Sequence, residues 1–250
     1  GGAGTGATGG GADVRPEKPA ELVSYVTGND ADSDVTPTGP GVILMGGGTD
    51  VDAAFTWWKP LIAGGDVVVL RTSGADGYNS YLYEDIGGCD SVETLMVTTP
   101  ALAADPYVAW TIAHAEGIFM AGGDQAQYLK NWKGTPVAEA IMTAYGRGGV
   151  VGGTSAGCAV LGELMFAAYN DTVYSDEALL DPYNRYMTME QGFLSLPLLT
   201  GVITDTHFVT RDRMGRLVGF LGRIVQDGWA NEVVGIGVDE KTAIVAGPDG

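Results

Sequence analysis

From residue 41 onward, short apolar runs alternate with amphipathic stretches, and glycine-rich turns separate them. A short apolar run bounded by glycine is typical of a buried strand, whereas apolar residues spaced three and four apart indicate a helix. On this basis we predict strands at 42–45, 66–71, 92–98, 117–121, 149–152 and 201–208. We predict helices at 50–62, 105–116, 135–145, 159–168 and 211–226, with a further helical stretch after 125.

This alternation of strands and helices predicts an α/β fold with three layers, in which a mostly parallel sheet carries helices on both faces. Ligands of such sheets bind at the carboxyl ends of the strands. Gly47, Gly123 and Ser155 all fall at or just past the ends of predicted strands. Any site that these residues form is therefore expected at one edge of the sheet.

Three segments fall outside the regular pattern. Residues 1–40 are rich in glycine and proline, and we interpret them as an N-terminal arm that precedes a single domain at 41–250. The segment 170–197 is polar, aromatic and long for a connection, and we predict that it forms a lid. The last apolar runs, 233–237 and 242–245, are predicted to form a closing hairpin.

The composition of the arm bears on assembly. Its first 12 residues are almost all Gly, Ala and Thr. Ordering such a segment costs backbone entropy, so an ordered arm is expected to be held by a neighbouring copy of the chain. We therefore predict a homo-oligomer, a dimer or a larger assembly. The alternative is an arm that lies along its own domain.

The charge balance narrows the possible partners. The chain has 13 Lys and Arg against 31 Asp and Glu, a net charge of −18, which argues against nucleic acid and anionic membranes because both bind basic surfaces. No apolar run approaches the ~18 residues of a membrane-spanning helix. The Gly-rich start without an initiator methionine is typical of a processed or exported product. We expect an extracellular or periplasmic protein, with the cytoplasm as the alternative, and we expect Cys89 and Cys158 to be free thiols.

A candidate nucleophile lies in the stretch Gly-Gly-Thr-Ser-Ala-Gly at 152–157. It follows a predicted strand and precedes a predicted helix, which is the setting of a nucleophile elbow. Small flanking residues let the strand and the helix approach closely while the hydroxyl of Ser155 stays exposed. The alternative interpretation is a Gly/Ala-rich turn with an idle serine, because short motifs often match by chance.

The chain contains two histidines, so few residues can serve as the general base. His114 lies in the middle of a predicted helix between two alanines, where a packing role is expected. His207 ends a predicted strand at the same edge of the sheet as Ser155. His207 is therefore the residue expected to accept the serine proton.

Four linked motifs resemble those of cyanophycinase-like proteins in the peptidase E (S51) family of serine peptidases. They are Gly-Gly-Asp-Gln at 122–125, the elbow at 152–157, Asp-Thr-His-Phe at 205–208 with the arginines that follow, and Gly-Ile-Gly-Val-Asp-Glu-x-Thr-Ala at 235–243. The resemblance implies a flavodoxin-like fold related to class I glutamine amidotransferases. It also implies a catalytic pair of Ser155 and His207, hydrolysis of aspartyl peptides, and no cofactor or metal.

The resemblance also implies further site residues. The backbone N–H groups of Gly123 and Ala156 would form the oxyanion hole, and Asp124 and Gln125 would contact substrate. The family places an acid between the serine and the histidine in sequence, and Asp171 occupies a similar segment, so we predict it as the third catalytic residue. Glu163 and Asp176 are the alternatives.

Two features bear on the substrate. The family usually carries an arginine two residues beyond the Gln of Gly-Gly-Asp-Gln, and this chain has Gln127 there. Arg211 and Arg213 follow His207 closely, and guanidinium groups pair well with carboxylates, so both are expected to hold a substrate carboxylate. Arg216 is equally well explained by a structural role. The favoured substrate carries one carboxylate with a neutral or cationic remainder, as an aspartyl-arginine unit does.

The sequence favours a serine exopeptidase of this type. A non-catalytic relative with a structural or assembly role is the second hypothesis, suggested by the glycine-rich arm and by Gln127. An α/β-hydrolase esterase is the third, but the His-Gly oxyanion loop that such enzymes carry is absent.

Overall fold

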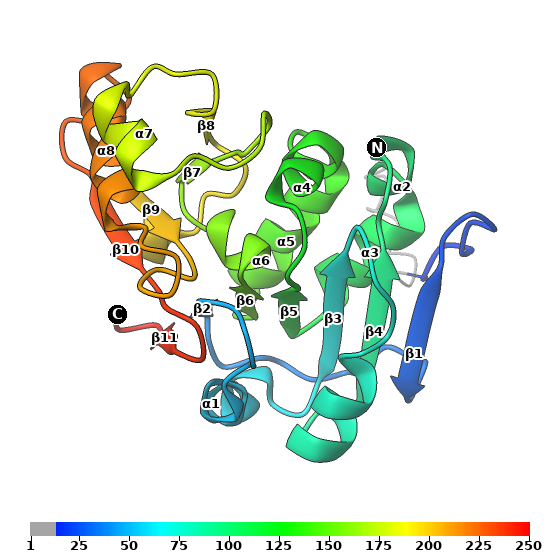
Figure 1. The fold of residues 1–250 in the computed structure, drawn as a ribbon. Coiled ribbons are helices and arrows are strands. Elements are labelled where there is room, and N and C mark those ends of the chain that lie inside the picture. The colour runs from blue at the N-terminus through cyan, green and yellow to red at the C-terminus, as the bar shows by residue number, and fades with distance from the viewer. Residues whose placement is uncertain (1–13) are drawn as a thin grey trace, which may run out of the picture.

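In the computed structural model, which describes residues 14–250, two β-sheets lie side by side with helices around them (Figure 1). The first sheet has the strand order β1-β4-β3-β5-β6-β2-β11. The five central strands are parallel, and the two outer strands are antiparallel to their neighbours. These strands are β1 (Ser24–Gly28), β2 (Gly41–Met45), β3 (Asp66–Arg71), β4 (Ser91–Met96), β5 (Gly117–Met120), β6 (Val150–Thr154) and β11 (Ala243–Ala246).

The second sheet is smaller and has the order β10-β9-β7-β8. It lies on the left in Figure 1 and is covered by α7 (Ser175–Leu180) and α8 (Met214–Gln226). Its strands are β7 (Leu164–Phe166), β8 (Met189–Gln191), β9 (Val202–Asp205) and β10 (Val234–Gly237). Aromatic and aliphatic side chains from both helices and from β7 and β9 form a separate buried cluster here.

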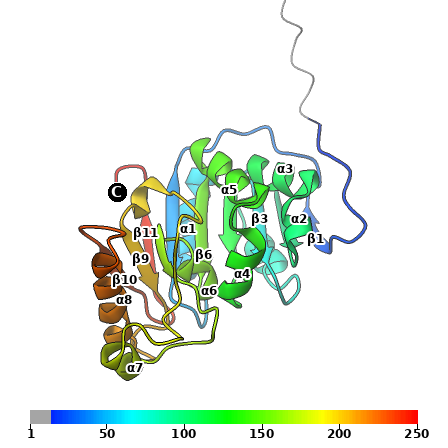
Figure 2. The same cartoon turned by 90° about the horizontal axis from the view of Figure 1, so that it is seen from above.

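Helices cover both faces of the first sheet (Figure 2). One face packs against α3, α4 and α5, and the other packs against α1 and the π-helical turn η1. The helices around this sheet are α1 (Asp52–Ile62), η1 (Tyr81–Ile86), α2 (Pro100–Ala103), α3 (Pro106–His114), α4 (Gln125–Trp132), α5 (Pro136–Gly146) and α6 (Ala156–Ala159), and the 3₁₀ turn η2 (Pro197–Leu199) precedes β9.

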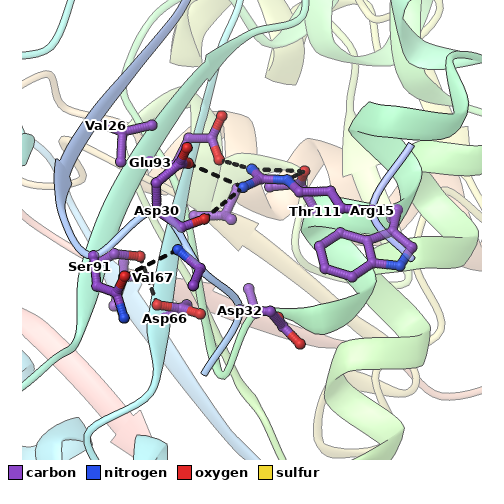
Figure 3. Close-up of a pocket in the computed structure, with 14 residues that line it drawn as sticks. Arg15, Val26, Asp30, Asp32, Asp66, Val67, Ser91, Glu93 and Thr111 are labelled. Carbon is purple, nitrogen blue, oxygen red and sulfur yellow. Dashed lines mark hydrogen bonds and ion pairs between the residues drawn. The ribbon is translucent and has the colours of Figure 1, made fainter. Parts of the chain in front are cut away.

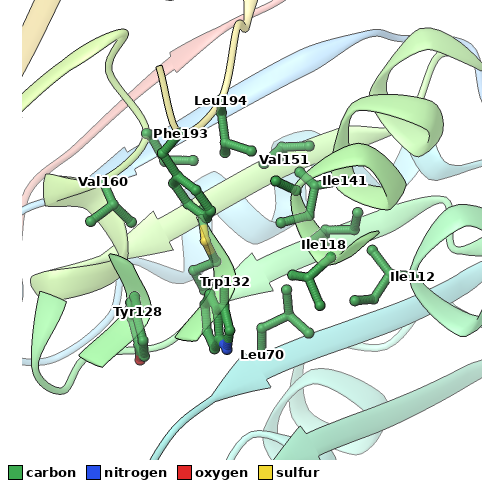
Figure 4. Close-up of a cluster of buried hydrophobic side chains, with 14 of the residues drawn as sticks. Leu70, Ile112, Ile118, Tyr128, Trp132, Ile141, Val151, Val160, Phe193 and Leu194 are labelled. Carbon is green, nitrogen blue, oxygen red and sulfur yellow. The ribbon is translucent and has the colours of Figure 1, made fainter. Parts of the chain in front are cut away.

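Burial on both faces explains why β2 carries no polar side chain. In β2, Val42 and Leu44 point into the cluster beneath α3 to α5, whereas Ile43 and Met45 point toward α1. Successive side chains of a strand face opposite sides, so a strand covered on both sides needs apolar residues at every position. Figure 4 shows the larger cluster, where Trp132 packs among residues of the strands and of α3 and α5.

The predicted α/β class with helices on both faces of a mostly parallel sheet is confirmed, and three local predictions are corrected. The predicted helix 159–168 ends at Ala159, and β7 begins at Leu164. The predicted hairpin is absent because β10 pairs in parallel with β9, whereas β11 pairs with β2 of the other sheet. The predicted strand 201–208 belongs to the second sheet.

The domain begins earlier than residue 41, because β1 pairs with β4 and Arg15 is fixed against the same strand. Arg15 forms an ion pair with the buried Glu93 (Figure 3). Its guanidinium also lies 4.6 Å from the ring centre of Tyr107. The predictions for residues 1–12, including their contact with another copy, lie outside the described residues.

Within residues 14–250, none of the helices combines the length and the apolarity needed to cross a membrane.

Candidate active site

Ser155 sits in a tight turn between β6 and α6. Its backbone has φ 51° and ψ −116°, a conformation that non-glycine residues rarely adopt. The turn is held because the N–H of Ser155 donates to the carbonyl of Met45, 3.1 Å away. Gly157 is required by close packing, since a Cβ at this position would lie 1.9 Å from the carbonyl oxygen of Met120. The strand, strained serine and short helix thus form the predicted elbow.

His207 follows β9 and comes from the second sheet. Its Nε2 lies 2.7 Å from Oγ of Ser155. The backbone N–H of His207 donates to the carbonyl of Gly46, 2.8 Å away, which ties this loop to the end of β2. Gly47 lets that loop pack on the imidazole, because a Cβ there would lie 2.4 Å from Cε1. The two sheets therefore meet at the pair Ser155 and His207.

Glu240 lies beside the other nitrogen of the ring. Its Oε1 is 2.6 Å from Nδ1 of His207. An ionised carboxylate can only accept a hydrogen bond, so Nδ1 carries the proton and donates to Glu240. Nε2 is then the acceptor that faces the serine hydroxyl. The three side chains have the arrangement of a nucleophile, its base and a carboxylate that orients the base.

This geometry corrects the prediction for the third residue. Oδ1 of Asp171 accepts from the N–H of Thr172 at 2.7 Å, and Asp171 lies in the wall of the cleft. Glu163 accepts from the N–H of Gly201, and Asp176 lies in the first turn of α7. None of the three bonds His207. The carboxylate that bonds His207 is that of Glu240.

The sequence motif at 235–243 contains Glu240 but does not by itself indicate this role. Glu240 follows β10, so its place beside His207 depends on the parallel pairing of β10 with β9. The neighbouring Asp239 fixes the loop after His207, because its Oδ1 accepts from the N–H groups of Val209 and Thr210 at 3.0 and 2.9 Å.

The environment lowers the pKa of His207 below its usual value. Burial is the largest cause, because it disfavours the charged imidazolium. The hydrogen bond to Glu240 acts in the opposite direction and raises the pKa, whereas the charges of Arg211 and Arg213 lower it further. The ring is therefore neutral at neutral pH and can accept a proton.

The expected oxyanion donors lie next to the serine. Ala156 directly follows Ser155, and a Cβ on Gly122 would lie 3.5 Å from Cβ of Ser155, which brings the loop with Gly123 close to the nucleophile. Tyr128 holds this loop, since its hydroxyl donates to the carbonyl of Ala121 at 2.7 Å. Among the backbone hydrogen bonds of turns, loops and caps in residues 14–250, neither Gly123 nor Ala156 donates. Both N–H groups remain predicted oxyanion donors.

A cleft of about 450 Å³ opens beside Ser155 and His207. Predicted substrate-binding residues line it, namely Asp124, Gln125, Arg211 and Arg213. Gln127 lies exposed on α4 and is not part of the lining. Lys130 and Tyr169 line the cleft as well, and the sequence pattern had not pointed to either.

The three arginines after His207 have different surroundings. Arg216 is buried and holds Asp205 through two hydrogen bonds of 2.8 and 2.5 Å, which supports its structural interpretation. Arg213 donates to the carbonyl of Thr206 at 2.8 Å, and burial lowers its pKa to about 10. The guanidinium of Arg211 has no hydrogen bond or ion pair to any residue in 14–250, so it is free to meet a ligand.

The remaining candidate residues lie elsewhere. His114 stacks on Trp110 within α3, as a packing role requires. Cys89 and Cys158 are free thiols, as predicted. Within the described part of the chain, no three His, Cys, Asp or Glu side chains are grouped so that they could hold a metal ion.

Comparison with known proteins places this site in context. The sequence model of peptidase family S51 matches residues 77–247. The chain is 33% identical over 171 residues to the cyanophycinase of Trichormus variabilis, a match that covers 68% of this chain and 51% of the relative. It is 31% identical over 173 residues to the cyanophycinase of Synechococcus elongatus, covering 68% of this chain and 49% of the relative. The chain thus spans about half the length of these curated relatives.

Two solved structures share the fold. A peptidase from an acI-B1 Actinobacterium superposes with a TM-score of 0.60 at 19% identity, over 84% of each chain. A putative peptidase E protein from Listeria monocytogenes EGD-e gives a TM-score of 0.52 at 17% identity, over 84% of this chain and 95% of the other. At these identities, the likeness concerns the fold.

Proposed function

Since the chain belongs to peptidase family S51, we propose that it is a serine exopeptidase that hydrolyses aspartyl peptide bonds, of the β-aspartyl-arginine type, through Ser155 and His207. The observation that carries the proposal is the continuous contact from Oγ of Ser155 through the imidazole to Glu240, with distances of 2.7 and 2.6 Å. An idle serine in a turn has no need of an oriented base.

The geometry supports acyl transfer in two steps. In the first, Nε2 of His207 takes the proton of Ser155 as Oγ attacks the scissile carbonyl, and the N–H groups of Gly123 and Ala156 stabilise the developing oxyanion. The imidazolium then gives its proton to the leaving amine, and an acyl-enzyme remains. In the second step, His207 deprotonates a water molecule that attacks the acyl carbonyl, and the proton returns to Ser155. Glu240 keeps the ring in the required tautomer throughout.

The cleft supports an aspartyl substrate. Arg211 faces it with a free guanidinium, which can grip a carboxylate by paired hydrogen bonds. Arg213 adds positive charge behind it, although its own donors are partly engaged. Asp124 and Asp171 lie in the same lining and suit the cationic remainder of an aspartyl-arginine unit.

The test compares the parent chain with Ser155→Ala, using Ser195→Ala as a control at an exposed serine. Each is assayed by product analysis on β-aspartyl-arginine, on an α-aspartyl dipeptide and on a small neutral ester, and by labelling with a fluorophosphonate probe. We expect the parent and Ser195→Ala to cleave an aspartyl peptide and to label, and Ser155→Ala to do neither. Turnover of Ser155→Ala within tenfold of the parent would refute the nucleophile. An unlabelled parent without activity would favour the non-catalytic alternative, and ester turnover alone would favour an esterase.

A further inference from the structure

Lys130 is a cation of the cleft that the reaction scheme above does not use. It lies on α4, one turn beyond Gln127, and lines the same cleft as Ser155 and His207. Gln127 occupies the position where the family carries an arginine, but it is exposed and does not line the cleft. The positive charge on this wall of the cleft is therefore supplied from position 130.

The position of Lys130 is fixed without neutralising its charge. Its Nζ lies 5.4 Å from the ring centre of Tyr169, a distance at which a cation is attracted to the aromatic face. The hydroxyl of Tyr169 donates to Oε1 of Glu190 at 3.2 Å. Glu190, which comes from β8, also forms an ion pair with Lys133, the residue directly after α4. The nearby carboxylate is thus occupied by Lys133, and the ammonium of Lys130 has no ion pair to any residue in 14–250.

Lys130 and Arg211 come from different sides of the site. In Figures 1 and 2, α4 belongs to the first sheet and lies on one side of α6, where Ser155 begins the helix. The segment 206–213, which carries His207 and Arg211, joins β9 to α8 of the second sheet on the other side of α6. A substrate bound at Ser155 would therefore lie between two free cations.

The charge of this cleft is opposite to that of the whole chain. Of the 13 basic residues in the sequence, four line it, whereas the chain as a whole carries −18. Asp205 neutralises Arg216, which leaves Lys130, Arg211 and Arg213 against the carboxylates of Asp124 and Asp171. A cleft of this kind concentrates anionic ligands where the remaining surface repels them.

We propose that Lys130 is a specificity-determining residue, which binds one of the two free carboxylates of a β-aspartyl dipeptide unit while Arg211 binds the other. Such a unit has two free carboxylates, instead of the one expected from the sequence, and they lie on opposite sides of its scissile amide: the α-carboxylate of the aspartyl residue and the C-terminal carboxylate of the following residue. Two cations placed on either side of Ser155 match this arrangement and select against units in which either carboxylate is blocked.

The inference rests on the proposed function, so its test includes a measurement that needs no turnover. Three ligands are compared: β-aspartyl-arginine, its α-carboxamide and its C-terminal carboxamide. Dissociation constants are measured by calorimetry on the Ser155→Ala background, and KM and kcat on the parent background. The variants are Lys130→Met, Lys130→Arg and Arg211→Met, with Lys18→Met as a control because Lys18 is bound to Ser24 far from the cleft.

In the Ser155→Ala protein with Lys130 and Arg211 intact, blocking either carboxylate should weaken binding about 10- to 100-fold, as expected for the loss of a charge-assisted hydrogen bond. In Lys130→Met, the difference between the free acid and one of the amides should fall to less than threefold. In Arg211→Met, the difference in dissociation constant between the free acid and the other of the two amides should fall in the same way. Lys130→Arg should restore the discrimination, and kcat should change much less than KM.

Two results would overturn the inference. In the first, Lys130→Met still discriminates against both amides as strongly as the protein with Lys130. In the second, Lys130→Met and Arg211→Met both abolish the discrimination against the same amide. If the parent binds the ligands in this pattern but cleaves none of them, the proposed function fails and the role of Lys130 stands.

Discussion

The reactivity of Ser155 depends on a ring that is fixed from three directions. Oγ of the serine lies against Nε2 of His207, Glu240 holds Nδ1, and Gly47 packs against the edge of the imidazole. Removing one of these contacts leaves the other two in place, so their contributions can be measured separately. The clearest tests are to replace the carboxylate of Glu240 and to measure the pH dependence that follows from the pKa of His207.

Replacing Glu240 by Gln should lower kcat strongly while leaving the fold intact. The amide has the same shape, but its NH₂ group can donate to the ring, which favours the tautomer whose Nε2 carries the proton. We expect kcat to fall by about 10²- to 10⁴-fold, as for other catalytic carboxylates that orient a histidine. Steady-state kinetics on an aspartyl peptide measures the loss.

Asp171→Asn is the matched control, because it removes a carboxylate from the cleft without touching His207. It should change KM more than kcat. Equal losses of kcat in the two variants would mean that Glu240 has no special role.

The pH dependence of catalysis follows from the same ring. The reaction requires neutral His207, so kcat/KM should fall as the pH decreases through the pKa of the imidazole. Because burial lowers this pKa, the acid midpoint should lie below about 6.5, the ordinary value for histidine. The hydrogen bond to Glu240 raises the pKa, so the residual activity of Glu240→Gln should have its midpoint at still lower pH. An acid midpoint above about 6.5 in the parent, or the same midpoint in both proteins, would contradict this assignment.

At the scale of elements, the elbow depends on the close approach of β6, α6 and β5. A side chain at Gly157 would collide with the backbone of Met120, which cannot move without disturbing the central sheet. Gly222 on α8 provides a contrast, because nothing lies within 4 Å of a Cβ built there. The same substitution at the two positions should therefore have opposite effects.

Gly157→Ala should lower the free energy of unfolding by about 1–3 kcal/mol through overpacking. Gly222→Ala should raise it by about 0.5–1 kcal/mol, because alanine favours the helix over the unfolded chain. Urea unfolding of both variants, followed by circular dichroism, tests the pair. A Gly157→Ala variant with the same free energy of unfolding as the parent would show that α6 can shift away from Met120 without loss of stability.

Most strands of the first sheet could be predicted from the sequence, because the pattern that identifies each strand lies within a few neighbouring residues. The run 42–45 is apolar throughout and lies between glycines, and the run 67–70 is apolar and follows Gly64 and Gly65 closely. The errors arose where pairing partners are distant in the sequence. β10 and β11 are each strand-like, but the choice of β9 and β2 as partners, instead of each other, depends on packing between two sheets.

The same limit applies to the candidate site. Ser155 and His207 could be predicted because each carries its own local signal, a glycine elbow and a strand that ends in histidine. Glu240 could not be assigned, since it reaches the ring only through the pairing of β10 with β9. Residues 159–168 have good helix formers, yet Leu164–Phe166 pairs with β8 and β9 instead, and tertiary contacts override propensity.

At the scale of the whole molecule, the candidate site lies where the two sheets meet. The N-terminal segment lies at the opposite edge of the first sheet, where β1 pairs with β4. The edge strand β1 covers β4, which would otherwise expose unpaired backbone groups. Arg15 precedes β1 and crosses to α3, where it contacts Thr111 and the rings of Tyr107 and Trp110. Its ion pair with Glu93 joins the segment to the core, and this link can be tested without touching the cleft.

Arg15→Met should lower the free energy of unfolding by about 2–4 kcal/mol, because it leaves the carboxylate of Glu93 buried without a cation. Tyr107 still donates to Glu93 at 3.0 Å, but a neutral donor compensates a buried charge less well than a guanidinium. The double variant Arg15→Met/Glu93→Gln removes the unpaired charge, so it should recover at least half of the loss. Urea unfolding gives the stabilities, and turnover at a temperature well below the transition should stay within twofold of the parent in both variants. If the double variant were as unstable as Arg15→Met, the contribution of Arg15 would come from its packing on Tyr107 and Trp110 instead of from its charge.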